Sequence, residues 1–216
     1  MGIFSPLLDL LFPPKCVFCH CVLGDDETEV CEKCAASVMI STGSYSARNM
    51  DSAVSFCYAP LTYEGNVKES LHRFKFGGNS FYADTYADTI CSTLNWDQIV
   101  CDVITWVPLS RARLRKRGYD QAGLIAQKIA ENRGIPCVRT LKKTKNVKPQ
   151  SSIKDPDARK KNISGVYTAV NPEFIKGKRI LLVDDIVTTG ATVSECAETL
   201  FEAGAASVGV VAAAHD

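Results

Sequence analysis

The 216-residue chain is predicted to form an α/β protein, with a mostly parallel twisted sheet flanked by helices and a small N-terminal module built on four cysteines. Two observations predict this organisation. In the second half of the chain, short apolar runs alternate with segments of helical periodicity, which is the pattern of βα units in a parallel sheet. Near the N-terminus, cysteines are gathered in pairs. We place the boundary at residue 45, giving a module over 1–45 and a main domain over 46–216.

The N-terminal module contains two Cys-x₂-Cys pairs separated by 11 residues. Two such pairs bring four thiolates within tetrahedral reach, which is typical of a structural zinc ribbon. His20 and Cys21 are alternative ligands, and a disulfide pair or buried free thiols are alternatives to a metal site. The predicted ligands of a structural Zn²⁺ are Cys16, Cys19, Cys31 and Cys34. A linker is expected over 41–44.

Apolar runs are too short for a membrane-spanning helix, which needs about 20 residues. The apolar segment 3–12 contains Asp9 and has no basic residues before it, so it does not fit a signal peptide. We expect it to be a short amphipathic helix packed on the protein. The sequence therefore predicts a cytoplasmic protein with no membrane span.

Apolar periodicity gives the elements of the main domain in order. Four-residue apolar runs without a polar face indicate buried parallel strands, and apolar residues spaced by three and four indicate helices. Strands are expected over 102–107, 136–138, 180–183 and 207–214. Helices are expected over 66–76, 121–132 and 193–201.

The segment that follows the strand over 180–183 carries the most specific chemistry. Asp184 and Asp185 end the apolar run, and a loop rich in Thr and Gly leads to the next helix. Backbone N–H groups at a helix N-terminus bind anions, and Gly190 lets the backbone approach a phosphate closely. The carboxylates would repel a phosphate, so they suit vicinal sugar hydroxyls or Mg²⁺. The pattern predicts a ribose 5-phosphate site. A simple N-capped helix is the alternative, but a cap needs one such residue rather than five.

Positive charge is concentrated in residues 107–162, which hold 16 Lys or Arg and 4 Asp or Glu, although the whole chain has a net charge of only +1. Such segregation indicates a segment that faces a polyanion; a solvated basic loop is the alternative. The cations over 111–117 directly follow a strand, at the same sheet edge as the acid pair. A pyrophosphate group would need cations there, and arginine binds it well.

These motifs also carry a resemblance. Residues 181–192, Leu-Leu-Val-Asp-Asp-Ile-Val-Thr-Thr-Gly-Ala-Thr, resemble the phosphoribosyl pyrophosphate (PRPP) motif of type I phosphoribosyltransferases. The cysteine pairs, Val-Pro-Leu over 107–109, Arg-Gly-Tyr-Asp-Gln over 117–121 and Phe-Lys-Phe-Gly-Gly over 74–78 extend the likeness to the ComF-type phosphoribosyltransferase-like family over essentially the whole chain. Asp120 stands where that family usually has Asn, at a position where the likeness places the choice of an acceptor substrate.

The resemblance implies a type I phosphoribosyltransferase fold that binds PRPP with Mg²⁺ and displaces its pyrophosphate. Asp184 and Asp185 would be the catalytic residues, holding the ribose hydroxyls, and Asp185 is the nearest candidate for a general base. Residues 115–119 would form a mobile lid over the site. The implied PRPP-binding residues are Asp184, Asp185, Thr188, Thr189, Gly190, Ala191, Thr192, Val107, Pro108, Leu109, Arg117 and Lys75.

The family likeness further implies a link to DNA uptake in natural transformation, with single-stranded DNA as a partner and peripheral contact with the uptake machinery. Three functions are left open. The first is a phosphoribosyltransferase with an unknown acceptor. The second is a single-stranded DNA-binding competence factor whose PRPP site is regulatory or vestigial; the basic segment supports it, with Tyr119 available to stack on a base. The third is a PRPP-sensing regulator, ranked last because no helix-turn-helix appendage is visible.

Overall fold

The structure, a computed structural model, describes residues 13–38, 53–144 and 165–216. The predicted helix over 3–12, the linker over 41–44 and the second part of the basic segment lie outside these ranges. Within them, no helix has both the length and the apolar character needed to cross a bilayer.

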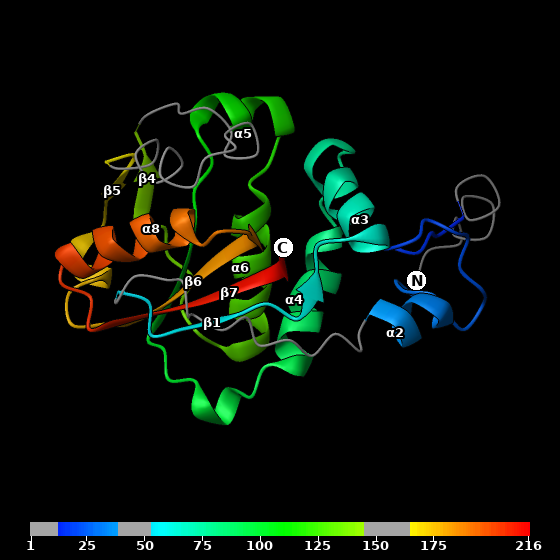
Figure 1. The fold of residues 1–216 in the computed structure, drawn as a ribbon, viewed down its shortest axis with the longest axis horizontal. Coiled ribbons are helices and arrows are strands. Elements are labelled where there is room, and N and C mark those ends of the chain that lie inside the picture. Colours follow the sequence, from blue (N-terminus) through cyan, green and yellow to red (C-terminus); the bar gives the residue numbers. More distant parts are fainter. Residues whose placement is uncertain (1–12, 39–52, 145–164) are drawn as a thin grey trace.

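A parallel sheet forms the centre of the main domain (Figure 1). Its strand order is β1 (Phe56–Tyr58), β7 (Ser207–His215), β6 (Arg179–Val187) and β3 (Val103–Trp106), and β2 (Leu61–Thr62) extends the pairing along β7. Beyond β3, Cys137 adds a parallel bridge to Ile104, inside the segment 136–138 that was expected to begin a strand. The predicted parallel sheet is confirmed.

Each face of the sheet supports its own apolar core. Leu181, Val183 and Val211 lie in a core shared with α3 (Gly65–Phe76), α4 (Tyr82–Thr93) and α6 (Gln121–Arg133). Leu182 and Val210 lie in the other, with α8 (Ala191–Glu202) and the antiparallel pair of β4 (Leu141–Lys143) and β5 (Tyr167–Ala169). This division follows from the alternation of side chains along a strand. Short elements complete the described chain: α2 (Glu32–Val38), α5 (Arg111–Arg117), η2 (Trp96–Gln98) and η4 (Pro172–Phe174).

The strand before the acid pair is longer than predicted. We expected it over 180–183 with the carboxylates in a loop, but β6 continues to Val187. The reason is its neighbour: β7 is nine residues long and pairs Asp184 with Ala212 and Val187 with His215. A polar residue stays in a strand when the adjacent strand supplies backbone partners, and sequence periodicity does not contain that information. The helix that follows also begins earlier, at Ala191.

Candidate functional site

Asp184 and Asp185 lie near the C-terminal end of β6, the edge at which open parallel sheets bind their ligands. Asp185 faces the α3 side, where its Oδ2 is 2.9 Å from the Lys75 Nζ. Both side chains of this ion pair are largely buried, at 18% exposed for Lys75 and 16% for Asp185. Two residues from distant segments, both predicted from the sequence to bind PRPP, are therefore in direct contact.

Asp184 lies in a different environment, with only 9% of the residue exposed. Burial raises the pKa of its carboxyl well above the usual range, and the negative charge of Asp185 raises it further. The Asp185 backbone N–H donates to the Asp184 Oδ1 over 2.8 Å, and this bond and Lys75 oppose the shift in pKa. The free protein therefore holds a carboxyl that resists ionisation beside one that is ion-paired.

The Thr- and Gly-rich loop connects β6 to α8 as expected. Gly190 has φ +76°, in the left-handed region that favours glycine, and it occupies the N-cap position of α8. Glycine has no side chain, so the N-cap residue itself supplies no capping oxygen to this helix start. A small pocket opens here; its walls come from Asp184, Ile186, Val187, Thr188, Gly190, Ala191, Thr192 and Val193. Thr189 is exposed at the rim of the loop.

One of the two carboxylates thus lies in the wall of the loop pocket, although a carboxylate was expected to face away from a bound phosphate. Burial and the charge of Asp185 raise the pKa of this carboxyl, so the acid in the pocket wall is the one that is harder to ionise. Sequence spacing placed the acids and the loop side by side but did not show which acid lines it.

The segment over 107–109 lies at the end of the neighbouring strand. The Val107 N–H donates to the Val183 carbonyl over 2.9 Å, which ties this segment to β6. Val107 and Pro108 are buried, so Leu109 is the more accessible member of the trio. The Leu109 N–H donates to the Asp120 Oδ2 over 2.9 Å.

Asp120 has a structural role that we did not expect. It is the N-cap of α6, and its Oδ1 accepts from the Gly123 N–H while its Oδ2 accepts from the Leu109 N–H. We expected the replacement of Asn by Asp to mark the choice of an acceptor substrate. Instead, both oxygens of this side chain hold the 107–109 segment to the start of a helix, a bridge that requires two acceptors.

The cations over 111–117 form the helix α5, with Ser110 as N-cap and Gly118 in the left-handed region at its C-terminal end. Arg117 is half-buried: its Nη1 donates to the Gln121 Oε1 over 2.8 Å, and its guanidinium lies 5.1 Å from the Phe76 ring centroid. Burial lowers the pKa of Arg117, and the charge of Asp185 opposes that shift. The contact with Phe76 places Arg117 beside the end of α3, the helix that carries Lys75.

Tyr119, which we expected to be available to stack on a base, is only partly exposed. Its hydroxyl donates to the Phe74 carbonyl, and its ring packs against the Phe74 ring with centroids 5.8 Å apart. These contacts anchor the C-terminal end of the predicted lid to α3.

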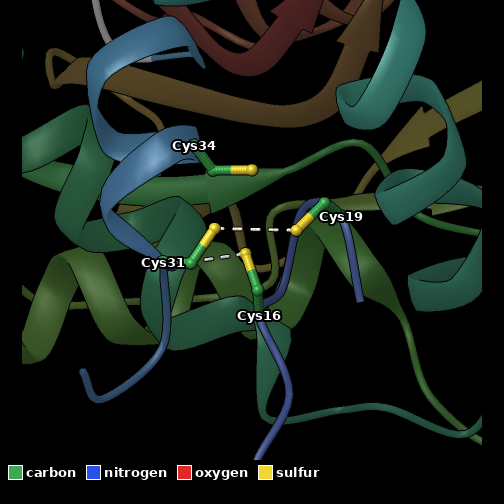
Figure 2. Close-up of side chains that lie close together, drawn as sticks. All are labelled: Cys16, Cys19, Cys31 and Cys34. Atoms are coloured by element: carbon green, nitrogen blue, oxygen red, sulfur yellow. Dashed lines mark hydrogen bonds between the residues drawn. The ribbon is translucent and has the colours of Figure 1, made fainter. Parts of the chain in front are cut away.

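The four predicted metal ligands converge in the N-terminal module (Figure 2). The Sγ atoms of Cys16, Cys19, Cys31 and Cys34 all lie within 4.8 Å of one another, and no disulfide joins these thiols. Tetrahedral Zn–S bonds of about 2.3 Å place sulfurs about 3.8 Å apart, so the set fits zinc. Among the described residues, His20 and Cys21 do not belong to this group, although the Cys21 Sγ is 3.2 Å from the Cys19 Sγ.

The module is joined to the main domain through α3 and α4. The Arg73 Nη2 donates to two backbone carbonyls between Cys16 and Cys19, that of Val17 at 3.0 Å and that of Phe18 at 2.6 Å. The buried Phe18 ring meets Tyr86 edge-on, with centroids 6.1 Å apart. Arg73 is two residues from Lys75, so one helix contacts both the cysteine module and the acid pair. The sequence did not reveal this role, because a surface arginine on a helix has no distinguishing pattern.

Two known protein families match this chain. Residues 114–216 match the family described as Phosphoribosyl transferase domain, and residues 7–46 match the family described as Double zinc ribbon domain. The chain carries a phosphoribosyltransferase domain preceded by a double zinc ribbon. The phosphoribosyltransferase match includes β6, the loop and α8, and the zinc ribbon match includes all four clustered cysteines.

Individual relatives are named for competence and for DNA utilization. Competence protein ComFC of Bacillus subtilis is 31% identical over 151 residues, covering 68% of this chain and 58% of the relative. DNA utilization protein YhgH of Escherichia coli is 33% identical over 112 residues, covering 50% of this chain and 47% of the relative. The chain thus spans about half the length of these curated relatives. A solved glutamine PRPP amidotransferase from B. subtilis is 25% identical with a TM-score of 0.40, covering 62% of this chain and 26% of that chain.

Proposed function

We propose that this protein binds PRPP with Mg²⁺ and acts as a ComF-type phosphoribosyltransferase-like protein in the handling of incoming DNA. One observation carries the PRPP site: a largely buried acid pair near the end of β6 precedes the Gly190 N-cap of α8, and Lys75 and Arg117 lie on the α3 side of the acids. This arrangement supports PRPP as the ligand. The N–H groups at the helix start suit its 5-phosphate, the carboxylates suit its diol, and the cations suit its pyrophosphate.

In this proposal the first-turn N–H groups of α8 and the loop hydroxyls hold the 5-phosphate, because a helix N-terminus attracts anions. Asp184 and Asp185 hold the ribose 2- and 3-hydroxyls, directly or through Mg²⁺. Lys75 leaves its ion pair with Asp185 when the ligand arrives and contacts the pyrophosphate. Arg117 and the 107–109 segment complete the pyrophosphate side.

The proposed reaction is displacement of pyrophosphate from C1 of the ribose by an acceptor nucleophile. The C1–O bond breaks as positive charge develops on the ring, so the chain must stabilise the departing pyrophosphate electrostatically. Mg²⁺, when bound, supplies further charge neutralisation of that group. The carboxylates at C2 and C3 orient the sugar and favour the cationic ring. Asp185 remains the nearest candidate for a general base.

A second function is favoured by α5: five of its seven residues are Lys or Arg, and none is acidic. Single-stranded DNA binding through this helix is consistent with relatives named for competence and DNA utilization. Under this alternative, PRPP occupies a regulatory or vestigial site, and the chain binds a strand without transferring phosphoribose.

Calorimetric titration of Mg–PRPP into the pure protein tests the main proposal. We expect micromolar binding by the wild type and none by the Asp184→Asn, Asp185→Asn double variant. The matched control is Asp25→Asn with Asp26→Asn, an adjacent exposed acid pair in the zinc ribbon that carries the same charge. The site assignment fails if the β6 double variant binds as tightly as this control.

The same titration with single-stranded DNA present separates the two functions. Release of pyrophosphate with a defined acceptor supports the transferase. A change in PRPP affinity caused by the strand supports a coupled DNA-handling role, since coupling between two ligands is reciprocal. DNA binding without any PRPP binding would leave only the nucleic-acid function.

A further inference from the structure

Cys21 is a fifth cysteine at the edge of the zinc ribbon, and its sulfur touches one of the predicted metal ligands. The Cys21 Sγ lies 3.2 Å from the Cys19 Sγ, and no disulfide joins the two. Cys21 does not belong to the group of four sulfurs that fits zinc. All ten cysteines of the chain lie in the described ranges, and Cys21 is the one that is exposed. The ribbon therefore carries a thiol that metal coordination does not use.

The local backbone holds this fifth sulfur against its neighbour. His20 has φ +64°, in the left-handed region, so the chain turns sharply between the two cysteines. In an extended segment, side chains two residues apart would be separated by about 7 Å. The Cys16 N–H donates to the Cys21 carbonyl over 2.8 Å, which ties the residue after the turn back to the cluster. The contact between the sulfurs of Cys19 and Cys21 is therefore built into the fold of the ribbon.

Two sulfurs in contact can be joined by hydrogen peroxide, and the metal ligand is the one that reacts first. A zinc ligand is a thiolate, which is also the form of cysteine that attacks a peroxide. The attack breaks the O–O bond and leaves a sulfenic acid on Cys19, while the other oxygen takes a proton from solvent and leaves as water. The Cys21 sulfur then attacks the Cys19 sulfur, the S–S bond forms, and the sulfenic hydroxyl departs as water with the Cys21 proton. Both sulfurs are oxidised, and the peroxide takes up the two electrons.

We propose that Cys19 and Cys21 form an oxidation site, at which a hydroperoxide creates a disulfide and thereby removes zinc from the ribbon. The disulfide leaves Cys16, Cys31 and Cys34 as ligands, one short of the tetrahedral set that a structural zinc requires. Cys31 also faces Cys19, with 3.6 Å between the sulfurs, but it is itself one of the four clustered sulfurs (Figure 2). Cys21 is the neighbour that can react without giving up a metal bond of its own.

Oxidation of this pair also affects the proposed PRPP site, through α3. The Arg73 Nη2 donates to the carbonyls of Val17 and Phe18, in the segment between the first two predicted ligands. Lys75 lies on the same helix and pairs with Asp185. A ribbon without zinc holds α3 less firmly, so Lys75 is less well positioned and PRPP binds more weakly. This consequence rests on the proposed function, whereas the oxidation site itself does not.

The test follows the zinc content of the full-length, zinc-loaded protein through oxidation by hydrogen peroxide and later reduction by dithiothreitol with added zinc. Elemental analysis after desalting gives the zinc content at each stage, and mass spectrometry of the digested protein locates any disulfide. The variant is Cys21→Ser, a change at an exposed position that preserves the size of the side chain. The matched control is Cys101→Ser, at a half-buried cysteine outside the ribbon.

Before oxidation, the wild type and both variants should each hold about one zinc per chain. The wild type and Cys101→Ser should lose this zinc to peroxide, form the Cys19–Cys21 disulfide, and regain the metal on reduction. Cys21→Ser should lose its zinc without regaining it, because an unresolved sulfenic acid proceeds to the irreversible sulfinic acid. The proposal would be overturned by full recovery of zinc in Cys21→Ser, by a wild-type disulfide that excludes Cys21, or by a Cys21→Ser protein that never holds zinc.

Calorimetry of Mg–PRPP with the reduced and the oxidised wild type tests the link through α3. Oxidation should weaken binding by about tenfold, within the usual range for coupling between two sites, and reduction with zinc should restore it. Equal affinities of the two forms would overturn this link. A protein that binds no PRPP in either form, but loses zinc reversibly through Cys21, would uphold the oxidation site and remove the proposed function.

Discussion

Replacing Asp184 with Asn is expected to stabilise the free protein while abolishing Mg–PRPP binding. Burial and the charge of Asp185 raise the pKa of this carboxyl, so the folded protein binds a proton that the unfolded chain releases at lower pH. Stability then falls as pH rises between the unfolded and folded pKa values, because the folded state binds more protons there. Asn is neutral at every pH and keeps the Oδ1 that accepts the 2.8 Å bond from the Asp185 N–H.

The expected gain follows from the environment of the side chain. Burying a polar group without full compensation costs about 1–3 kcal/mol, and a charged group costs more, so removing the charged state of this side chain is stabilising. Lys75 offsets part of the cost in the wild type, so we expect about 2 kcal/mol. For a protein of this size that gain raises the Tm by about 4–8 °C.

Thermal unfolding followed by circular dichroism, from about pH 8 to about pH 5, measures this gain. The difference between Asp184→Asn and wild type should shrink as pH falls, because protonated Asp and Asn are both neutral. Asp97→Asn, at an exposed position in η2, is the control and should show no such trend. A lower Tm for Asp184→Asn at the higher pH, or a difference that does not depend on pH, would refute this account of the buried carboxyl.

Three other predictions address the remaining parts of the site. Lys75→Met should weaken Mg–PRPP binding by about tenfold or more. Because Lys75 lowers the pKa of Asp184, the variant should also lose binding at a higher pH than the wild type as the pH falls. Calorimetry checks this with the exposed Lys68→Met as control, and an unchanged affinity contradicts it. Cys16→Ser with Cys19→Ser should remove about one zinc per chain and lower the Tm, as measured by elemental analysis and thermal unfolding; full metal content would refute the ribbon. Asp120→Ala should lower the free energy of unfolding in urea by about 1–2 kcal/mol and Asp120→Asn by less, because Asn retains one acceptor. Equal stability of the two variants would disprove the bridge that Asp120 makes between Leu109 and α6.

Local sequence determined the parts of this protein that depend on short-range pattern. Short apolar runs identified β3, β6 and β7, although β1 was not predicted, and the two Cys-x₂-Cys pairs identified four side chains that meet within 4.8 Å. The acid pair and the loop before α8 were also predicted in the right order. In these cases the chemistry lies in residues that are neighbours along the chain, so spacing alone constrains the geometry.

The tertiary structure decided what depends on packing between distant segments. The length of β6 followed from its pairing with β7, which kept both carboxylates inside a strand and gave them different surroundings. Lys75 reaches Asp185 because α3 packs against the face of the sheet to which Asp185 points. Asp120 joins the 107–109 segment to α6, which packs against the same face. Phe76 remained on the surface while Tyr119 was packed against the core. Periodicity gives the faces of each element, but the burial and the partners of a side chain are fixed only when the elements come together.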